Sequence, residues 1–407
     1  MVLSDLDFFA SVDVGSSKIA VLIANIEDNK FHVIGHASGP SSGVKNGAIV
    51  NVEGAAKAIQ NVIDKVNKNC KHKPKFIDIN VTDLHLSSRN QNRPISFNGR
   101  TKIITQEDTL QAIQNSSAGA LATNKKNLDP IVNHFTVDEQ IENSPIGMEA
   151  AVLGAEVHLI SVSNQAINNI SHSLRASDLG VDKIILDPIA SSMVCVSQDD
   201  KNTGVCLLDI GAGTSKLSVF VKGGVVFNQV FDIGGNTITQ CIAQAYDTSF
   251  DDAEELKKTY GTLQTDSTIK DRLIKFKKIG STEDHYLSLH ELILVIEKPY
   301  KEICTMVKRS LKKEKLDRAI KSGFILLGGA CKIKYCENFL LKEFRARSRM
   351  AKINEDLVSG DMKILNNLSY FSALGLLACN TPKSYLQEPE QLQKSGLFGT
   401  MQELFKL

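Results

Sequence analysis

The chain has 407 residues, of which 42% are hydrophobic and 23% charged, and its net charge is +1. A chain of this length can bury a sizeable core and form two or more domains. The balanced charge and the lack of a long basic block argue against a nucleic-acid partner, and no apolar run is long enough to span a bilayer. The eight cysteines are scattered without metal-ligand spacing. They predict a reduced cytosolic protein rather than a disulfide framework or a zinc site.

The first predicted strand, residues 8–12, leads directly into a carboxylate and a glycine turn. Asp13 is followed by the run Gly15-Ser16-Ser17-Lys18. Glycine lets backbone N–H groups approach an anion closely, and the hydroxyls add further donors. The turn is therefore typical of phosphate binding, although a strand-end aspartate can also form a simple Asx turn. The elements predicted next are strands at 18–26, 31–35 and 76–81 and a helix at 52–66.

The pattern changes between residues 84 and 162, where no phosphate turn occurs. A helix begins after Thr105, which can cap it through the acidic residues that follow. This stretch is predicted to be a small inserted subdomain. Its predicted strands are residues 85–91, 94–98, 134–137 and 157–162.

The same strand-and-turn pattern returns in the second half of the chain. An apolar run from Gly204 delivers Asp209 to the turn Gly211-Ala212-Gly213-Thr214. Two such turns predict two similar halves that face one phosphate-bearing ligand. Neither turn has Walker spacing, and the second lacks the third glycine of a dinucleotide fingerprint.

Around and after this turn the sequence predicts a mixture of helices and strands. Asp187-Pro188 begins a helix, since proline suits the first helical turn. Residues 247–320 are polar and are predicted to be largely helical. An apolar strand at 324–327 ends in Gly328-Gly329-Ala330, and a helix rich in small residues covers 370–379.

The last residues form a linker and an amphipathic segment. Residues 381–393 are polar and are predicted to be a flexible linker. On a helix, residues 394–407 would present one apolar stripe, which suits insertion into a membrane interface. The stripe could alternatively dock on the body of the protein or on a partner. It consists of Leu397, Phe398, Met401, Leu404 and Phe405.

Taken in order, these motifs resemble the phosphate, connecting and adenosine motifs of the actin/Hsp70/sugar-kinase superfamily. Within it the chain is similar to the FtsA family of bacterial cell-division proteins. The stretches Val44-Lys45-Asn46-Gly47, Ser144-Pro145-Ile146-Gly147-Met148 and Val157-His158-Leu159-Ile160 carry this resemblance, together with the linker and tail. It implies an α/β, actin-like two-lobed fold with a ribonuclease-H-like duplicated core, an FtsA-type inserted subdomain and a C-terminal amphipathic helix.

The resemblance also implies a division of the chain. Lobe 1 would comprise 1–83, 163–198 and 366–380 (subdomain 1A) with 84–162 inserted (1C). Lobe 2 would comprise 199–235 and 321–365 (2A) with a small subdomain at 236–320 (2B). The linker 381–393 and the membrane-targeting helix 394–407 would follow.

The same resemblance implies a site for ATP and Mg²⁺ between the lobes. Asp13 and Asp209 would hold Mg²⁺ through its waters. Asp187 could orient a water for hydrolysis, but its side chain is short for that role. It could instead interact favourably with the dipole at the N-terminus of its helix. ATP is therefore predicted to be mainly structural, with slow hydrolysis or none. The phosphate-binding residues implied are Asp13, Gly15, Ser16, Ser17, Lys18, Asp209, Gly211, Gly213 and Thr214, and the nucleoside-binding residues are Gly235, Glu254, Lys257, Gly328, Gly329 and Ala330.

The family's role would be to tether FtsZ filaments to the cytoplasmic face of the cell membrane at the division site. It would also self-polymerise as an actin-like filament and bind other divisome proteins. The FtsZ contact is expected in 236–320, although Pro299 stands where relatives commonly have arginine and should kink its helix. Two alternatives remain open, an actin-like scaffold of another membrane machine such as a pilus, and a small-molecule kinase.

Overall fold

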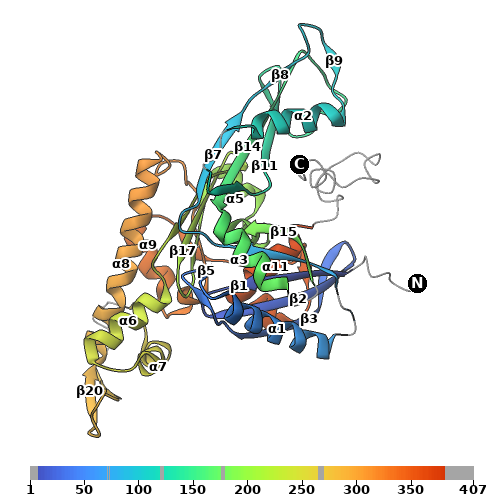
Figure 1. The fold of residues 1–407 in the computed structure, drawn as a ribbon. Helices are drawn as coiled ribbons and strands as arrows, with labels where there is room; N and C mark the ends of the chain where they lie inside the picture. Colours follow the sequence, from blue (N-terminus) through green and yellow to red (C-terminus); the bar gives the residue numbers. More distant parts are fainter. Residues whose placement is uncertain are drawn as a thin grey trace.

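The computed structural model describes residues 8–70, 72, 74–119, 123–175, 179–264 and 270–380. The linker and the apolar stripe of residues 394–407 lie outside these described residues. Figure 1 shows two large bodies side by side, a narrow extension at the top and a smaller helical part at the lower left. These are called lobe 1, lobe 2, the insert and the small subdomain below.

Lobe 1 is built on a six-stranded sheet with the order β15-β6-β1-β2-β3-β23. The first three strands form an antiparallel meander, whereas β6 lies parallel to β1 and β15 parallel to β6. The Val12 and Ile19 side chains in this sheet are fully buried. The strands are β1 Phe8–Val14, β2 Lys18–Glu27, β3 Lys30–Pro40, β6 Phe76–Val81, β15 Gly180–Leu186 and β23 Val358–Ser359.

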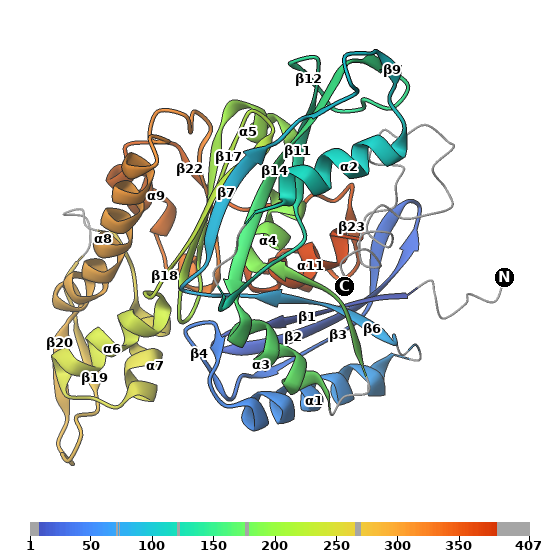
Figure 2. The ribbon, with the colours of Figure 1, turned by 45° about the horizontal axis from the view of Figure 1, so that its top comes forward.

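Helices cover both faces of this sheet (Figure 2). α1 (Val52–Asn69) packs against β2 and β3 with a continuous apolar stripe, and Asn51 caps it by accepting a hydrogen bond from the Gly54 N–H. α3 lies beside α1, and α4 and α11 occupy the opposite face. The remaining elements of lobe 1 are β4 Val44–Lys45, β5 Ala48–Ile49, α3 Asn164–Leu174, α4 Asp187–Cys195, α10 Met362–Leu365, η4 Leu368–Tyr370 and α11 Phe371–Ala378.

Lobe 2 repeats the sheet of lobe 1. Its order, β18-β17-β16-β21-β22, again has an antiparallel meander followed by two parallel strands. β16 therefore occupies the position in lobe 2 that β1 has in lobe 1. The predicted duplicated two-lobed α/β core is confirmed. Its elements are α5 Gln198–Thr203, β16 Val205–Ile210, β17 Ser215–Val221, β18 Gly224–Phe231, β21 Gly323–Leu327, η3 Gly329–Lys332, α9 Cys336–Phe344 and β22 Ser348–Met350.

Alternate residues of β16 belong to two different cores. Val205 and Leu207 join the cluster that surrounds α4 and α11, while Cys206 and Leu208 join the cluster around α8. The strand reads as a continuous apolar run because both of its faces are buried. The chain returns to lobe 1 before residue 366, because β23 pairs with β3 and Ile364 packs in the lobe 1 core.

The small subdomain contains α6 Gly235–Tyr246, α7 Phe250–Tyr260, β19 Leu273–Phe276, β20 His285–Ser288 and α8 Leu289–Lys313. β19 and β20 form a hairpin that the sequence analysis did not predict, while α7 and α8 account for the helical character expected of residues 247–320. α8 continues through Pro299 without interruption, and Pro299 lies on its buried face. Within the described ranges, no helix combines the length and the apolar character needed to cross a bilayer.

The insert has a sheet and a core of its own. Its long strand β14 pairs with β7, β8, β10 and β11, and α2 packs over it. Thr105 and Asp108 form the capping box at the start of α2, so the predicted cap is confirmed. The elements are β7 Ser87–Asn92, β8 Ile95–Ser96, β9 Lys102–Ile103, α2 Gln106–Ser117, β10 Lys125–Asn127, β11 Ile131–Val137, β12 Gln140–Glu142, β13 Glu149–Ala150 and β14 Val152–Ser163.

A buried histidine joins the insert to lobe 2. His158 on β14 is fully buried, and its Nε2 lies 2.8 Å from the Asn228 Nδ2 on β18, while its Nδ1 contacts the Asn90 Oδ1. An amide donor at Nε2 and a carbonyl acceptor at Nδ1 fit the neutral ring. Burial lowers the pKa of His158 to about 4. Asn133 adds two hydrogen bonds to the backbone of Val225, so the insert covers the edge strand of lobe 2.

Acidification is expected to weaken this contact. Because the pKa of His158 is lower in the folded chain than in the unfolded chain, its contribution is complete above pH 6.5 and is lost as the pH falls from 6.5 towards 4. Between pH 7.5 and pH 5 the loss should be about 2 kcal/mol of unfolding free energy. Urea unfolding at both pH values measures it. The matched variant His158→Gln has no group to titrate here, so an equal pH dependence in both proteins would contradict the expectation.

Candidate nucleotide site

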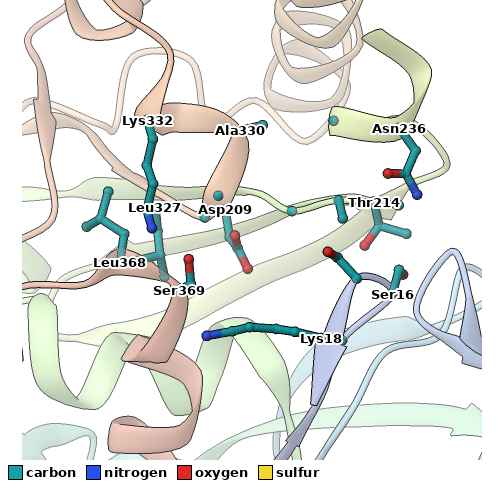
Figure 3. Close-up of a pocket in the computed structure, with 18 of the residues that line it drawn as sticks. Ser16, Lys18, Asp209, Thr214, Asn236, Leu327, Ala330, Lys332, Leu368 and Ser369 are labelled. Carbon is teal, nitrogen blue, oxygen red and sulfur yellow. The ribbon is translucent and has the colours of Figure 1, made fainter. Parts of the chain in front are cut away.

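A cavity of about 460 Å³ lies between the lobes, within the range of small-molecule sites. It collects the residues that the sequence predicts for the site from both halves of the chain. Figure 3 shows Ser16 of lobe 1 facing Thr214 of lobe 2, with Asp209, Lys18 and Lys332 around the same space. The predicted residues that line it are Asp13, Gly15, Ser16, Ser17, Lys18, Asp187, Asp209, Gly211, Gly213, Thr214, Gly235, Glu254, Lys257, Gly328, Gly329 and Ala330.

The two glycine turns have the same local geometry. In the first, the Gly15 N–H donates to the Lys18 carbonyl at 3.0 Å, and in the second the Gly211 N–H donates to the Thr214 carbonyl at 2.9 Å. Each turn joins the first two strands of its sheet, so the duplication extends from the sheet to the turn. The backbone amides and hydroxyls of both turns therefore border one cavity, which can surround an anion.

The two turns also meet each other directly. A Cβ atom on Gly213 would lie 2.6 Å from the Ser16 Oγ and 2.9 Å from the Asn46 Cα. The Ser16 Oγ accepts a hydrogen bond from the Gly47 N–H, and the Asn46 Nδ2 donates to the Asp232 Oδ1 at 2.5 Å. Gly213 is thus required by the close approach of the lobes. Asn46 and Asp232 form a polar link across that approach, which the sequence did not predict.

Three carboxylates lie in the floor of the cavity with one ammonium group. The Lys216 Nζ donates to the Asp187 Oδ2 and, at 3.2 Å, to the Asp209 Oδ2. All four charged groups, including Asp13, are buried. Burial alone would lower the pKa of Lys216, but the charges of Asp187 and Asp209 outweigh it and raise that pKa above its ordinary value. Lys216 is therefore held in its protonated form inside the site.

Asp13 has a different partner. Its Oδ1 accepts a hydrogen bond from the Asn80 Nδ2 at 2.8 Å, and the Asn80 Oδ1 accepts from the Val14 N–H. Burial, together with the charge of Asp187, raises the pKa of Asp13 to about 7. Asn80 thus orients Asp13 from the neighbouring strand β6.

The Asp13 and Asp209 carboxylates do not fit the predicted magnesium site. A hydrated Mg²⁺ held by Asp13 and Asp209 needs their oxygens as acceptors for its waters. One oxygen of Asp13 already accepts from Asn80, and Asp209 accepts from a buried ammonium that would repel a divalent cation. Among the residues that the structure describes, no group of three or more His, Cys, Asp or Glu side chains is arranged to hold a metal ion.

Asp187, the candidate for orienting water, is tied to Lys216 through one oxygen. Its other oxygen, Oδ1, is buried and has no hydrogen-bond partner within the described part of the chain. A buried carboxylate oxygen without a donor is costly unless a donor arrives. Asp187 is therefore held by an ion pair at the helix start, and its second oxygen is buried without a donor among the described residues.

The far side of the cavity is formed by lobe 2 and the small subdomain. Lys257 forms an ion pair with Glu254 at 2.6 Å and donates to the Gly235 carbonyl at 2.9 Å. The Tyr300 hydroxyl donates to the Ala330 carbonyl and fixes the Gly328-Gly329-Ala330 turn. Glu254 and Lys257 thus face the cavity rather than forming a fully solvated helix face; their contact with a nucleoside stays a prediction.

Two further lysines line the cavity, of which Lys18 was predicted from the sequence and Lys332 was not. Lys18 points into the site, and its Nζ lies 3.5 Å from the centre of the Tyr370 ring. Burial lowers the pKa of Lys18 to about 8. Lys332 donates to the Asn367 Oδ1 at 2.7 Å and was not predicted. Of the missed residues, Lys216 had the clearest signal, because it directly follows the glycine turn and precedes the apolar part of the next strand.

Two family models match parts of the chain. Residues 206–375 match the family model "Cell division protein FtsA", and residues 84–161 match "SHS2 domain inserted in FTSA". The chain is 29% identical over 370 residues to the cell division protein FtsA of Pseudomonas aeruginosa, covering 90% of this chain and 87% of the relative. It is 27% identical over 388 residues to that of Neisseria meningitidis, covering 94% and 92%.

Solved structures share the fold at low identity. A PilM–PilN type IV pilus biogenesis complex has a TM-score of 0.66 and 15% identity, covering 92% of this chain and 98% of that chain. MreB5 of Spiroplasma citri bound to ADP has a TM-score of 0.57 and 12% identity, covering 95% and 100%. These likenesses confirm the predicted actin-like fold, and the match of residues 84–161 to the inserted SHS2 domain confirms the inserted subdomain.

Proposed function

The chain belongs to the FtsA family of cell-division proteins, and from that premise we propose that it is an ATP-binding, polymerising tether that holds FtsZ filaments at the cytoplasmic membrane. The observation that carries the nucleotide part is the convergence of two duplicated glycine turns on one cavity between the lobes. Amides and hydroxyls from both halves are what a polyphosphate needs. The ligand would hold the lobes together in the arrangement seen here.

The membrane part of the proposal rests on the sequence after residue 380. A polar linker precedes an amphipathic segment with five apolar residues on one stripe. One such segment binds a bilayer only weakly, because a few apolar side chains at an interface give limited burial. Polymerisation would combine many weak segments into one strong attachment. The proposed location is the cytoplasmic face of the cell membrane at the division site.

The FtsZ contact is proposed on the small subdomain, residues 236–320, and other division proteins are further partners. Pro299 lies on the buried face of α8, so its side chain is not offered to a partner there. The exposed face of the same helix, which carries Leu294, is the better candidate. The family matches are to a cell-division protein, whereas the likeness to the pilus complex concerns the fold alone. The pilus and kinase alternatives therefore have less support.

ATP is proposed to be mainly structural. Asp187 is a short side chain already paired with Lys216, so it is poorly suited to activating a water. Hydrolysis should accordingly be slow or absent. Steady-state phosphate release by the purified protein measures this, and rapid turnover would overturn this part of the proposal.

Phe405→Glu is expected to abolish binding to lipid vesicles while ATP binding persists. Phe405 belongs to the apolar stripe, and losing one buried aromatic side chain costs roughly 1.5–3 kcal/mol, or about tenfold to a hundredfold in affinity. The assay is co-sedimentation with liposomes, with and without FtsZ and ATP.

The matched control is Thr400→Glu, which adds the same charge to the same segment outside the stripe. It should bind liposomes within about threefold of the unaltered protein. Retention of the Phe405→Glu variant on liposomes would refute the membrane part of the proposal.

A further inference from the structure

The buried ammonium of Lys216 lies among three buried carboxylates, of which Asp13 and Asp209 are the two that the family resemblance assigns to magnesium. It contacts the acid at the start of α4 and the acid at the end of β16. Lys216 and Asp209 are also direct partners across strands β16 and β17, so the antiparallel register places them together. A sheet position fixes the ammonium more firmly than a loop could.

Each of these carboxylates already has a donor within the protein. Lys216 donates to Asp187 and Asp209, and Asn80 donates to Asp13. A metal bound through its waters would use the same oxygens in the same way, as hydrogen-bond acceptors beside a positive charge. The protein therefore supplies each of the three carboxylates with one donor from its own side chains, while the Asp187 Oδ1 has no partner among the described residues.

The cavity lining as a whole is rich in positive charge. It contains six lysines against four carboxylates, which are Lys18, Lys216, Lys257, Lys258, Lys332 and Lys334 against Asp13, Asp187, Asp209 and Glu254. Lys332 points into the cavity near Asp209, and Lys18 enters it from the lobe 1 turn (Figure 3). Fixed ammonium groups can compensate phosphate charge directly.

We propose that Lys216 is the resident cation of this site and takes the place of the divalent metal, so that ATP binds almost equally well with and without Mg²⁺. This inference rests on the proposed function, because it takes the cavity to be an ATP site. It concerns how the charge of that ligand is balanced.

The first test is ATP binding by the full chain, measured by isothermal titration calorimetry in excess MgCl₂ and in excess EDTA. The dissociation constant should differ by less than about threefold between the two conditions. A loss of more than about tenfold on chelation would overturn the inference. This comparison uses the unaltered protein and depends on no variant.

The second test is Lys216→Met, which keeps much of the apolar stem and removes the charge. Its ATP binding should be lost in EDTA and should recover in excess MgCl₂, because the three carboxylates then need an external cation. Equal binding by the variant and the unaltered protein in EDTA would contradict the inference. The control is Lys275→Met on β19, a lysine paired with Asp284 outside the cavity, which should bind as the unaltered protein does.

Removing Lys216 alone leaves buried carboxylates without a counter-charge and can prevent folding. The pair Asp187→Asn with Lys216→Met removes one charge of each sign and is the version to use in that case, with the same expected dependence on Mg²⁺. The outcomes separate this inference from the proposed function. No ATP binding in either condition would overturn both the ATP site and the inference, whereas binding that requires Mg²⁺ in the unaltered protein would overturn the inference alone.

Discussion

Replacing Gly375 with alanine is expected to lower the free energy of unfolding by about 3 kcal/mol, at the upper end of the usual cost of overpacking. Gly375 lies in α11, where that helix crosses α4 in the core of lobe 1. A Cβ atom there would lie 1.9 Å from the Ala190 carbonyl oxygen and 2.9 Å from the Ser191 nitrogen. These are backbone atoms of a helix, so they cannot rotate away as a side chain would.

The sign of this effect is informative because helix propensity predicts the opposite. Alanine in place of glycine inside a helix stabilises it by roughly 0.5–1 kcal/mol when there is room. The matched control is Gly54→Ala in α1, where the nearest atom is the Ser42 hydroxyl at 3.2 Å and the nearest backbone lies at 3.4 Å. Guanidinium unfolding followed by circular dichroism compares the two. Equal midpoints for the Gly375→Ala variant and the unaltered protein would refute the close helix crossing.

The small-residue character of α11 was visible in the sequence, but its partner was not. Helical spacing and small side chains predict a tightly packed helix, yet they do not say which element it crosses. That information comes from the tertiary structure, in which Gly375 faces Ala190 of a helix 185 residues earlier. The same limit applies to β23, whose two residues join β3 after a separation of more than 300 residues.

The cavity could be predicted more fully than the packing. A strand that ends in a carboxylate and a glycine turn is a local pattern, and it occurs twice, at Asp13 and Asp209. Such local patterns predict structure well, because turn type and strand burial depend mainly on residues that are close in the sequence. Lys216 was missed although its register is also local, because its hairpin partner Asp209 was interpreted only as a ligand of phosphate and metal.

The hairpin β19–β20 was missed for a physical reason. It is two-stranded, and on each strand a single residue is buried, Ile274 and Leu287. Exposed apolar residues such as Leu273 and Tyr286 blur the alternation that identifies a strand. Short strands with one buried residue give too weak a pattern to separate from a polar helix.

Replacing Gly213 with valine is expected to lower the affinity for ATP by at least about a hundredfold while the chain stays folded. Gly213 is buried where the phosphate turn of lobe 2 meets lobe 1, and a side chain there would collide with Ser16 and with the backbone of Asn46. The lobes would then have to separate at the point where both turns must face one ligand. Circular dichroism should be unchanged, because the collision lies between the lobes and not within either core.

Side chains of increasing size at Gly213 are expected to weaken ATP binding by increasing amounts. Alanine adds a single Cβ close to the Ser16 side chain and the Asn46 Cα, whereas valine adds two further methyl groups at the same point, so Gly213→Ala should lose less affinity than Gly213→Val. The control is Gly119→Val in the insert, where the nearest atom that the new Cβ would meet is the movable end of Arg89. Calorimetric titration with ATP ranks the four proteins. Affinity of the Gly213→Val variant within about threefold of the unaltered protein would mean that ATP binds without the two turns closing on it, and the nucleotide site would have to be sought elsewhere in the cavity.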